Sequence, residues 1–108
     1  MAVRSSILIV DDDPDIRKVL NLLLNTTYDV AEVEDGASAI DYIREHPETD
    51  LVLLDVMMPG MSGLETCNEL RRYSNAPVLF LTAKTQENDK RRAYDAGGDG
   101  YLAKPFSH

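Results

Sequence analysis

The chain has 108 residues and a formal net charge of -8, which fits a single domain and argues against binding to a nucleic acid backbone by this chain itself. Its uninterrupted apolar runs are far shorter than the roughly 20 residues of a membrane-spanning helix, so we expect a soluble, cytoplasmic protein without membrane contact. Cys67 is the single cysteine, which excludes an internal disulfide and favours a small core residue.

The first predicted strand is the apolar run ILIV at Ile7 to Val10, and three aspartates follow it directly. Asp13 is suited to cap a helix that begins at Pro14, because its carboxylate can accept hydrogen bonds from free backbone N–H groups. Asp11 and Asp12 have no such structural explanation. The predicted helix has one apolar stripe, formed by Ile16, Val19, Leu20 and Leu23.

Two further strands follow, with a helix between them. Val30 to Val33 predicts a weaker strand of mixed polarity, and the helix expected at 36–46 is ended by Pro47. The next strand is the apolar run Leu51 to Leu54. Asp55 stands at its carboxyl end, before a loop that contains proline and glycine.

The second half of the chain repeats this alternation. Ser62 and Glu65 have the spacing of a capping box, which predicts a helix at about 62–74. The remaining predicted elements are a strand at Pro77 to Thr82, a helix at about 87–96 and a short strand at Gly100 to Ala103.

Strands that alternate with helices predict an α/β fold, here a three-layer sandwich with right-handed crossovers around a parallel sheet. Continuous apolar runs mark strands covered on both faces, which are the first, third and fourth, whereas the second and fifth resemble edge strands. The flavodoxin-like five-stranded order 2-1-3-4-5 satisfies this pattern. In that order the carboxyl ends of the strands meet at one crevice.

The residues at those strand ends carry complementary charges. Asp11, Asp12 and Asp55 would share the crevice with Thr82 and Lys104. Two carboxylates about 4 Å apart repel by roughly 4 kcal/mol at an effective dielectric near 20, so the cluster needs cations. An all-oxygen site with room for water suits Mg²⁺, and Asp55 becomes a candidate phosphoryl acceptor.

Four motifs follow one another along the chain. They are Asp11 and Asp12 after ILIV, LLDVMMPGMSG around Asp55, LTA at Leu81 to Ala83, and GYLAKPF at Gly100 to Phe106. Together they resemble the receiver domain of bacterial two-component response regulators, over essentially the whole chain, 1–108. Receiver domains continue into a fifth helix that is absent here, so we expect a C-terminally truncated domain with exposed apolar sheet surface.

The resemblance implies that Asp55 accepts a phosphoryl group from a phosphohistidine on a sensor histidine kinase or a phosphotransfer protein. It implies that Mg²⁺, or Mn²⁺, is held by Asp12, Asp55 and the backbone carbonyl of Met57, with Asp11 contributing through water. The phosphorylated domain would act as a switch, not a turnover enzyme, on an output domain or partner beyond this chain. It also allows a phosphorylation-linked dimer of the full-length protein.

Other positions also match the family. Thr82 and Tyr101 match its switch positions, and Lys104 matches its phosphate-contacting lysine. The peptide bond from Lys104 to Pro105 corresponds to a bond that the family usually keeps cis. The resemblance further implies a candidate kinase-docking surface on the first helix, around Ile16, Arg17 and Leu20, although Leu20 fits a core position at least as well.

Met57 and Lys84 stand two residues after the phosphoacceptor and two after the switch threonine. In the family these positions help or hinder the water that hydrolyses the acyl phosphate. Neither a thioether nor an ammonium is a good base for an attacking water, so we predict slow self-dephosphorylation.

Two other functions remain open at this point. A Mg²⁺-dependent phosphohydrolase would begin with Asp-x-Asp-x-Thr, but Asp15 stands where the threonine is expected. A receiver-like scaffold that is never phosphorylated is disfavoured by the presence of Asp55, Thr82 and Lys104. A dinucleotide-binding enzyme is set aside, because acids follow the first strand where a glycine-rich phosphate loop is needed.

Overall fold

Parallel strands alternate with helices in the computed structural model, which describes residues 4–82 and 98–103, with the side chains of Thr82, Tyr101 and Ala103 excepted. The elements are β1 (Ser6–Val10), α1 (Pro14–Leu24), β2 (Asp29–Val33), α2 (Gly36–Glu45), β3 (Leu51–Asp55), α3 (Gly63–Leu70), β4 (Val78–Thr82) and β5 (Gly100–Ala103). The helix predicted at about 87–96 lies outside the described residues. In the described part of the chain, no helix has the length and apolar character needed to cross a membrane.

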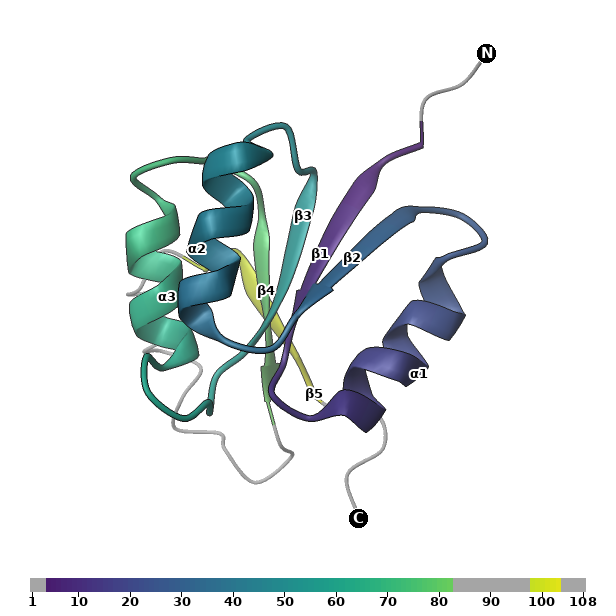
Figure 1. The fold of residues 1–108 in the computed structure, drawn as a ribbon, viewed down its shortest axis with the longest axis horizontal. Helices are drawn as coiled ribbons and strands as arrows, with labels where there is room; N and C mark the ends of the chain where they lie inside the picture. The colour runs from purple at the N-terminus through teal and green to yellow at the C-terminus, as the bar shows by residue number, and fades with distance from the viewer. Residues whose placement is uncertain (1–3, 83–97, 104–108) are drawn as a thin grey trace.

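The strands form one sheet in the order β2-β1-β3-β4-β5, and every neighbouring pair is parallel (Figure 1). The predicted parallel sheet and the order of its first four strands are confirmed. Val10 pairs with Leu54, and Asp55 pairs with Leu81, so β1, β3 and β4 end close to one another. The expected absence of a fifth helix concerns residues beyond the described ranges and stays a prediction.

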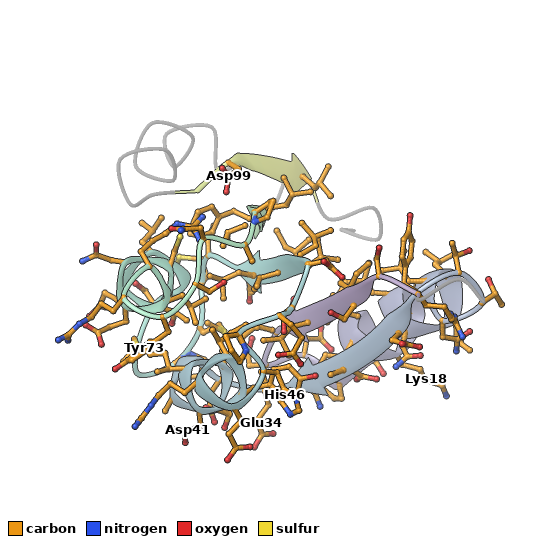
Figure 2. All side chains as sticks on the ribbon, turned by 90° about the horizontal axis from the view of Figure 1, so that it is seen from above. Lys18, Glu34, Asp41, His46, Tyr73 and Asp99 are labelled. Carbon is orange, nitrogen blue, oxygen red and sulfur yellow. The ribbon has the colours of Figure 1, made fainter. Side chains whose placement is uncertain are left out.

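Each face of the sheet has its own apolar core, because successive side chains of a strand point to opposite faces. Leu8 and Leu54 pack on the side of α2 and α3, whereas Ile9 and Leu53 pack on the side of α1 with Leu20. Figures 1 and 2 show α2 and α3 side by side on one face and α1 on the other. The described elements therefore form the three layers expected from the sequence.

The apolar stripe of α1 differs in part from the prediction. Ile16, Leu20 and Leu24 follow one another at intervals of four residues and pack over the sheet, with Leu20 buried. Leu23 is instead 64% exposed, so its assignment to the stripe is wrong. The burial of Leu20 also removes it from the kinase-docking surface that the resemblance implied.

The helix starts follow the predicted caps. Asp13 accepts a hydrogen bond from the Asp15 N–H at 2.9 Å, and Ser62 and Glu65 form the complete capping box of α3. The end of α3 is different, because the helix stops at Leu70 instead of continuing to about 74. The Arg72 and Tyr73 N–H groups bond to carbonyls three residues back, at 3.1 and 2.9 Å, so the chain tightens into turns.

Cys67 lies fully buried on α3, inside the core shared with α2. Burial raises the pKa of its thiol, which keeps the group protonated at neutral pH. The prediction of a small core residue is confirmed.

Asp35 caps α2 through its side-chain oxygen, which accepts a hydrogen bond from the Ser38 N–H at 2.8 Å. That bond holds the pKa of Asp35 below its ordinary value of 3.8. We expect Asp35→Ala to lower the free energy of unfolding by about 1 kcal/mol at neutral pH, whereas Asp35→Asn keeps the acceptor and costs less.

The stabilisation from Asp35 depends on pH. Because its folded pKa is depressed, the carboxylate's contribution is present above the unfolded pKa and is lost as the pH falls through the folded pKa. Urea unfolding at about pH 7 and about pH 3 should therefore show a smaller gap between the wild type and Asp35→Ala at the acidic pH. An equal gap at both values would contradict this account of the cap.

The start of β5 is attached to β4 and α3 by one carboxylate. Asp99 accepts hydrogen bonds from the Val78 N–H and from Arg71, both at 2.9 Å, while its own N–H donates to the Val78 carbonyl. Arg71 also donates to the Ala76 carbonyl at 2.7 Å. These bonds place β5 beside β4, with Asp99 at the beginning of the strand (Figure 2).

Candidate functional site

The carboxyl ends of β1 and β3 bring together three acids. Asp11 and Asp12 follow β1 directly, and Asp55 is the last residue of β3. One carboxylate oxygen from each lies within 4.8 Å of the others. Asp11 and Asp55 are buried, whereas Asp12 is exposed. The convergence of these three acids, expected from the strand order, is therefore present in the structure.

Asp11 is fixed through both its backbone and its side chain. Its N–H donates to the Val33 carbonyl at 3.3 Å, and one carboxylate oxygen accepts a hydrogen bond from the Asp13 N–H at 3.0 Å. Its carbonyl oxygen accepts a hydrogen bond from Arg17 at 2.6 Å. The side chain of Asp11 is completely buried, so its position is set by β2 and the start of α1.

Asp55 is held between β4 and the start of α3. The residue is 4% exposed, and its carboxylate accepts a hydrogen bond from the Met57 N–H at 3.3 Å. The next residue, Val56, donates to the Leu81 carbonyl at 3.2 Å and accepts from the Gly63 N–H at 3.0 Å. Gly63 passes so close to the Asp55 backbone that a side chain there would meet its carbonyl group. The phosphoacceptor candidate is thus held by backbone contacts on both sides.

Gly60 in the β3–α3 loop and Gly63 at the start of α3 are glycines for different structural reasons. Gly60 has φ +74°, in the left-handed region that glycine adopts without strain. Gly63 does not need the left-handed region, and a glycine is required there because the backbone passes close to Asp55. The sequence marks both glycines only as a turn, so the special role of Gly63 depends on the placement of α3.

The other predicted site residues are described in part. Thr82 lies at the end of β4, next to the pair formed by Asp55 and Leu81, and Tyr101 lies in β5, but their side chains are outside the described part. Met57 is 61% exposed on the loop after β3. Lys84, Lys104 and Pro105 lie outside the described residues, so their roles and the predicted cis bond stay predictions.

The three carboxylates fit a hard divalent cation. At separations of up to 4.8 Å, each pair of charges repels by roughly 3 to 4 kcal/mol at an effective dielectric of 20. The donor set contains only oxygen, which suits Mg²⁺ or Mn²⁺ and not a metal that prefers thiolate or imidazole. Asp11, Asp12 and Asp55 are therefore the residues that would hold such an ion.

Sequence reasoning did not identify the role of Arg17. The resemblance places it on a candidate kinase-docking face of α1, but its guanidinium contacts the Asp11 carbonyl and lies 3.4 Å from the Glu32 carboxylate. One signal was present, because a cation near the N-terminus of a helix opposes the helix dipole and needs another reason to be there.

Comparisons with known proteins agree with this geometry. A family model described as the response regulator receiver domain matches residues 7–108. The chain is 47% identical over 102 residues to the uncharacterized transcriptional regulatory protein YrkP of Bacillus subtilis, a match that covers 94% of this chain and 43% of that protein. It is 43% identical over 105 residues to the DNA-binding response regulator MtrA of Mycolicibacterium smegmatis, covering 96% and 46%. The chain thus spans less than half the length of these curated relatives.

A solved structure shows the same fold. The chemotaxis protein CheY4 of Vibrio cholerae matches with a TM-score of 0.87 and 31% identity, over 97% of this chain and 90% of that one. The flavodoxin-like arrangement of a parallel sheet with helices is therefore shared along nearly the whole of both chains.

Proposed function

This chain belongs to the response regulator receiver domain family, and from that premise we propose that it is a phosphorylation-controlled switch with Asp55 as the phosphoacceptor. The observation that carries the proposal is the convergence of the Asp11, Asp12 and Asp55 carboxylates. As a receiver domain of a two-component response regulator, it would take the phosphoryl group from a histidine on a sensor kinase or phosphotransfer protein. The reaction modifies the domain once and is not a turnover activity.

In the proposed reaction a carboxylate oxygen of Asp55 attacks the phosphorus of the phosphohistidine. The new O–P bond forms as the P–N bond breaks, and the imidazole leaves with the bonding electrons and takes up a proton. Asp55 is suited to this step because it is buried and its carboxylate is oriented by the Met57 N–H. Lys104 and Thr82 are proposed to contact the phosphoryl oxygens.

A divalent cation fits the same residues. Asp11, Asp12 and Asp55 would hold Mg²⁺ or Mn²⁺ together with the backbone carbonyl of Met57. The ion supplies positive charge that offsets both the three carboxylates and the phosphoryl oxygens. The requirement for an ion follows from the repulsion among the acids, which rises further when a phosphoryl group approaches.

The proposed output is a shift between two conformations. Thr82 and Tyr101 are the proposed switch residues. Thr82 lies on β4 and Tyr101 on β5, the last strand of the order 2-1-3-4-5. The signal would pass to an output domain of a longer cytoplasmic protein or to a partner, with dimerisation as one response. DNA binding, which the name of MtrA attributes to that protein, would belong to an output domain, since this chain carries a net charge of -8.

Acetyl phosphate with Mg²⁺ tests the proposal, with intact mass as the readout. We expect one phosphoryl adduct per chain, no adduct in EDTA, and peptide mapping that places the group on Asp55. Continuous release of inorganic phosphate over many turnovers would favour the phosphohydrolase instead. A chain that acquires no adduct from acetyl phosphate or from a phosphorylated histidine donor would support a scaffold and overturn the switch.

The phosphorylated form should be long-lived. Met57 exposes its thioether two residues after the phosphoacceptor, where it offers no base to an attacking water. We expect the double variant Met57→Asn, Lys84→Glu to lose the adduct about tenfold faster, measured as the decay of the adduct after removal of acetyl phosphate. Lys18→Glu is the matched charge control, because Lys18 is exposed on α1. Unchanged decay in the double variant would contradict the predicted role of these two positions.

A further inference from the structure

The guanidinium of Arg17 connects the acidic site to two neighbouring elements. One terminal nitrogen donates to the Asp11 carbonyl at 2.6 Å, and Nε lies 3.4 Å from the Glu32 carboxylate on β2. The two side chains are 17% and 32% exposed, so the ion pair is partly shielded from water. Arg17 therefore ties α1 to the end of β1 and to β2 at once.

Glu32 is itself held on its other side. Asn21 donates to the second carboxylate oxygen of Glu32 at 2.6 Å and accepts a hydrogen bond from the Asn25 side chain at 3.0 Å. The α1 side chains and Glu32 thus form a continuous chain of polar contacts that ends on the Asp11 carbonyl. Such a chain restricts the rotamers of Arg17, since both the guanidinium and its acidic partner have fixed neighbours.

The Asp11 carbonyl belongs to the planar peptide unit that joins Asp11 to Asp12. Rotation of that plane redirects the backbone at Asp12 and hence its exposed carboxylate. Asp11 has further restraints, because its N–H bonds to Val33 and its carboxylate bonds to Asp13. The hydrogen bond from Arg17 is thus placed to set the direction of Asp12 relative to Asp11 and Asp55.

We propose that Arg17 is a positioning residue for the divalent cation site, and that Glu32 orients it and offsets its charge. This inference rests on the proposed function, because it assumes that Asp11, Asp12 and Asp55 bind the ion. Arg17 could act on the site through its charge or by positioning a ligand, and its removal changes the affinity for the divalent cation in opposite directions in the two cases. A guanidinium that acts only through its charge weakens binding of a divalent cation, so its removal would tighten binding, whereas loss of a positioning residue weakens it.

A titration of the full chain with Mn²⁺ alone, monitored by calorimetry, measures whether the loss of Arg17 weakens or tightens cation binding. We expect Arg17→Met to weaken Mn²⁺ binding about tenfold, as is typical when a residue that orients metal ligands is removed. Arg17→Lys keeps the charge but cannot reach both partners in the same way, so it should restore only part of the affinity. Glu32→Gln should also weaken binding, because it leaves the guanidinium charge unbalanced beside the site.

Arg72→Met is the matched control. Arg72, in the turn after α3, forms an exposed ion pair at 3.4 Å with Glu69 on α3, so this variant loses the same charge without touching the acids. Unfolding in EDTA should show that Arg17→Met is folded throughout the titration. Binding by Arg17→Met that equals or exceeds that of the wild type would overturn the positioning role. Absence of Mn²⁺ binding by the wild type would overturn the proposed cation site itself.

Discussion

Asp55→Asn is expected to abolish phosphorylation by acetyl phosphate while the chain stays folded. An amide oxygen is a far weaker nucleophile than a carboxylate, so no phosphoryl adduct should be detected by intact mass. Asparagine has nearly the same shape and can still accept the hydrogen bond from the Met57 N–H, which is 3.3 Å from the carboxylate oxygen. The loss should therefore be chemical and not a result of unfolding.

The same variant should be at least as stable as the wild type, whereas unspecific damage to the fold would lower the stability. Asp55 is 4% exposed and lies near two other acids, so its charge costs roughly 3 to 4 kcal/mol of repulsion per pair at a dielectric of 20, before other groups compensate. Removal of that charge should leave the unfolding temperature in EDTA equal to or above that of the wild type. The further stabilisation by Mg²⁺ should shrink, because the ion loses a ligand.

Asp50→Asn is the matched control for Asp55→Asn. Asp50 stands just before β3, at the opposite end of the strand, and its carboxylate accepts a hydrogen bond from the Ser6 N–H at 2.8 Å. An asparagine there keeps an acceptor and removes the same charge, so phosphorylation should proceed at the wild-type rate. An adduct that still forms on Asp55→Asn would place the phosphoacceptor elsewhere and would end the proposal for this residue.

The predictable parts of the fold depend on short stretches of sequence. Asp11 and Asp55 were identified because each follows an apolar run, and parallel strands in this order must end side by side. The caps at Asp13 and Ser62 depend on the spacing of side chain and backbone within one turn. The caps need only local sequence, whereas the meeting of Asp11 and Asp55 also needs the strand order, which the pattern of apolar runs predicted.

The missed features depend on contacts between elements. The sequence carries no stop signal near Leu70, because neither glycine nor proline follows for several residues, and the helix ends by tightening into turns instead. Leu23 and Leu24 both fit an apolar helical stripe, and only the direction of α1 across the sheet packs Leu24 against the core and exposes Leu23. The bond from Arg17 to Asp11 likewise depends on how α1 leaves the sheet.

Gly63→Ala is expected to destabilise the fold by about 3 kcal/mol or more, which is at the upper end for a core position that is overpacked by a single carbon. A Cβ at this position would lie 2.8 Å from the Asp55 carbonyl carbon and 2.9 Å from the Val56 Cα, and closer still to the Asp55 carbonyl oxygen. All three atoms belong to the backbone of β3 and its loop, so no side-chain rotation can relieve the contact. Either α3 or the end of β3 has to move.

Whether Gly63→Ala lowers or raises the free energy of unfolding distinguishes the effect of close packing from that of helix propensity. Gly63 is the first residue of α3 and does not require the left-handed region, so propensity alone predicts that alanine stabilises the helix by up to about 1 kcal/mol. Gly60→Ala is the control, since φ is +74° but no atom lies within 4 Å of a Cβ there, and the cost should be about 1 to 2 kcal/mol of backbone strain. Urea unfolding in EDTA measures both variants. If Gly63→Ala proves as stable as the wild type, α3 does not press against the Asp55 backbone, and Asp55 is not held in place in the way described.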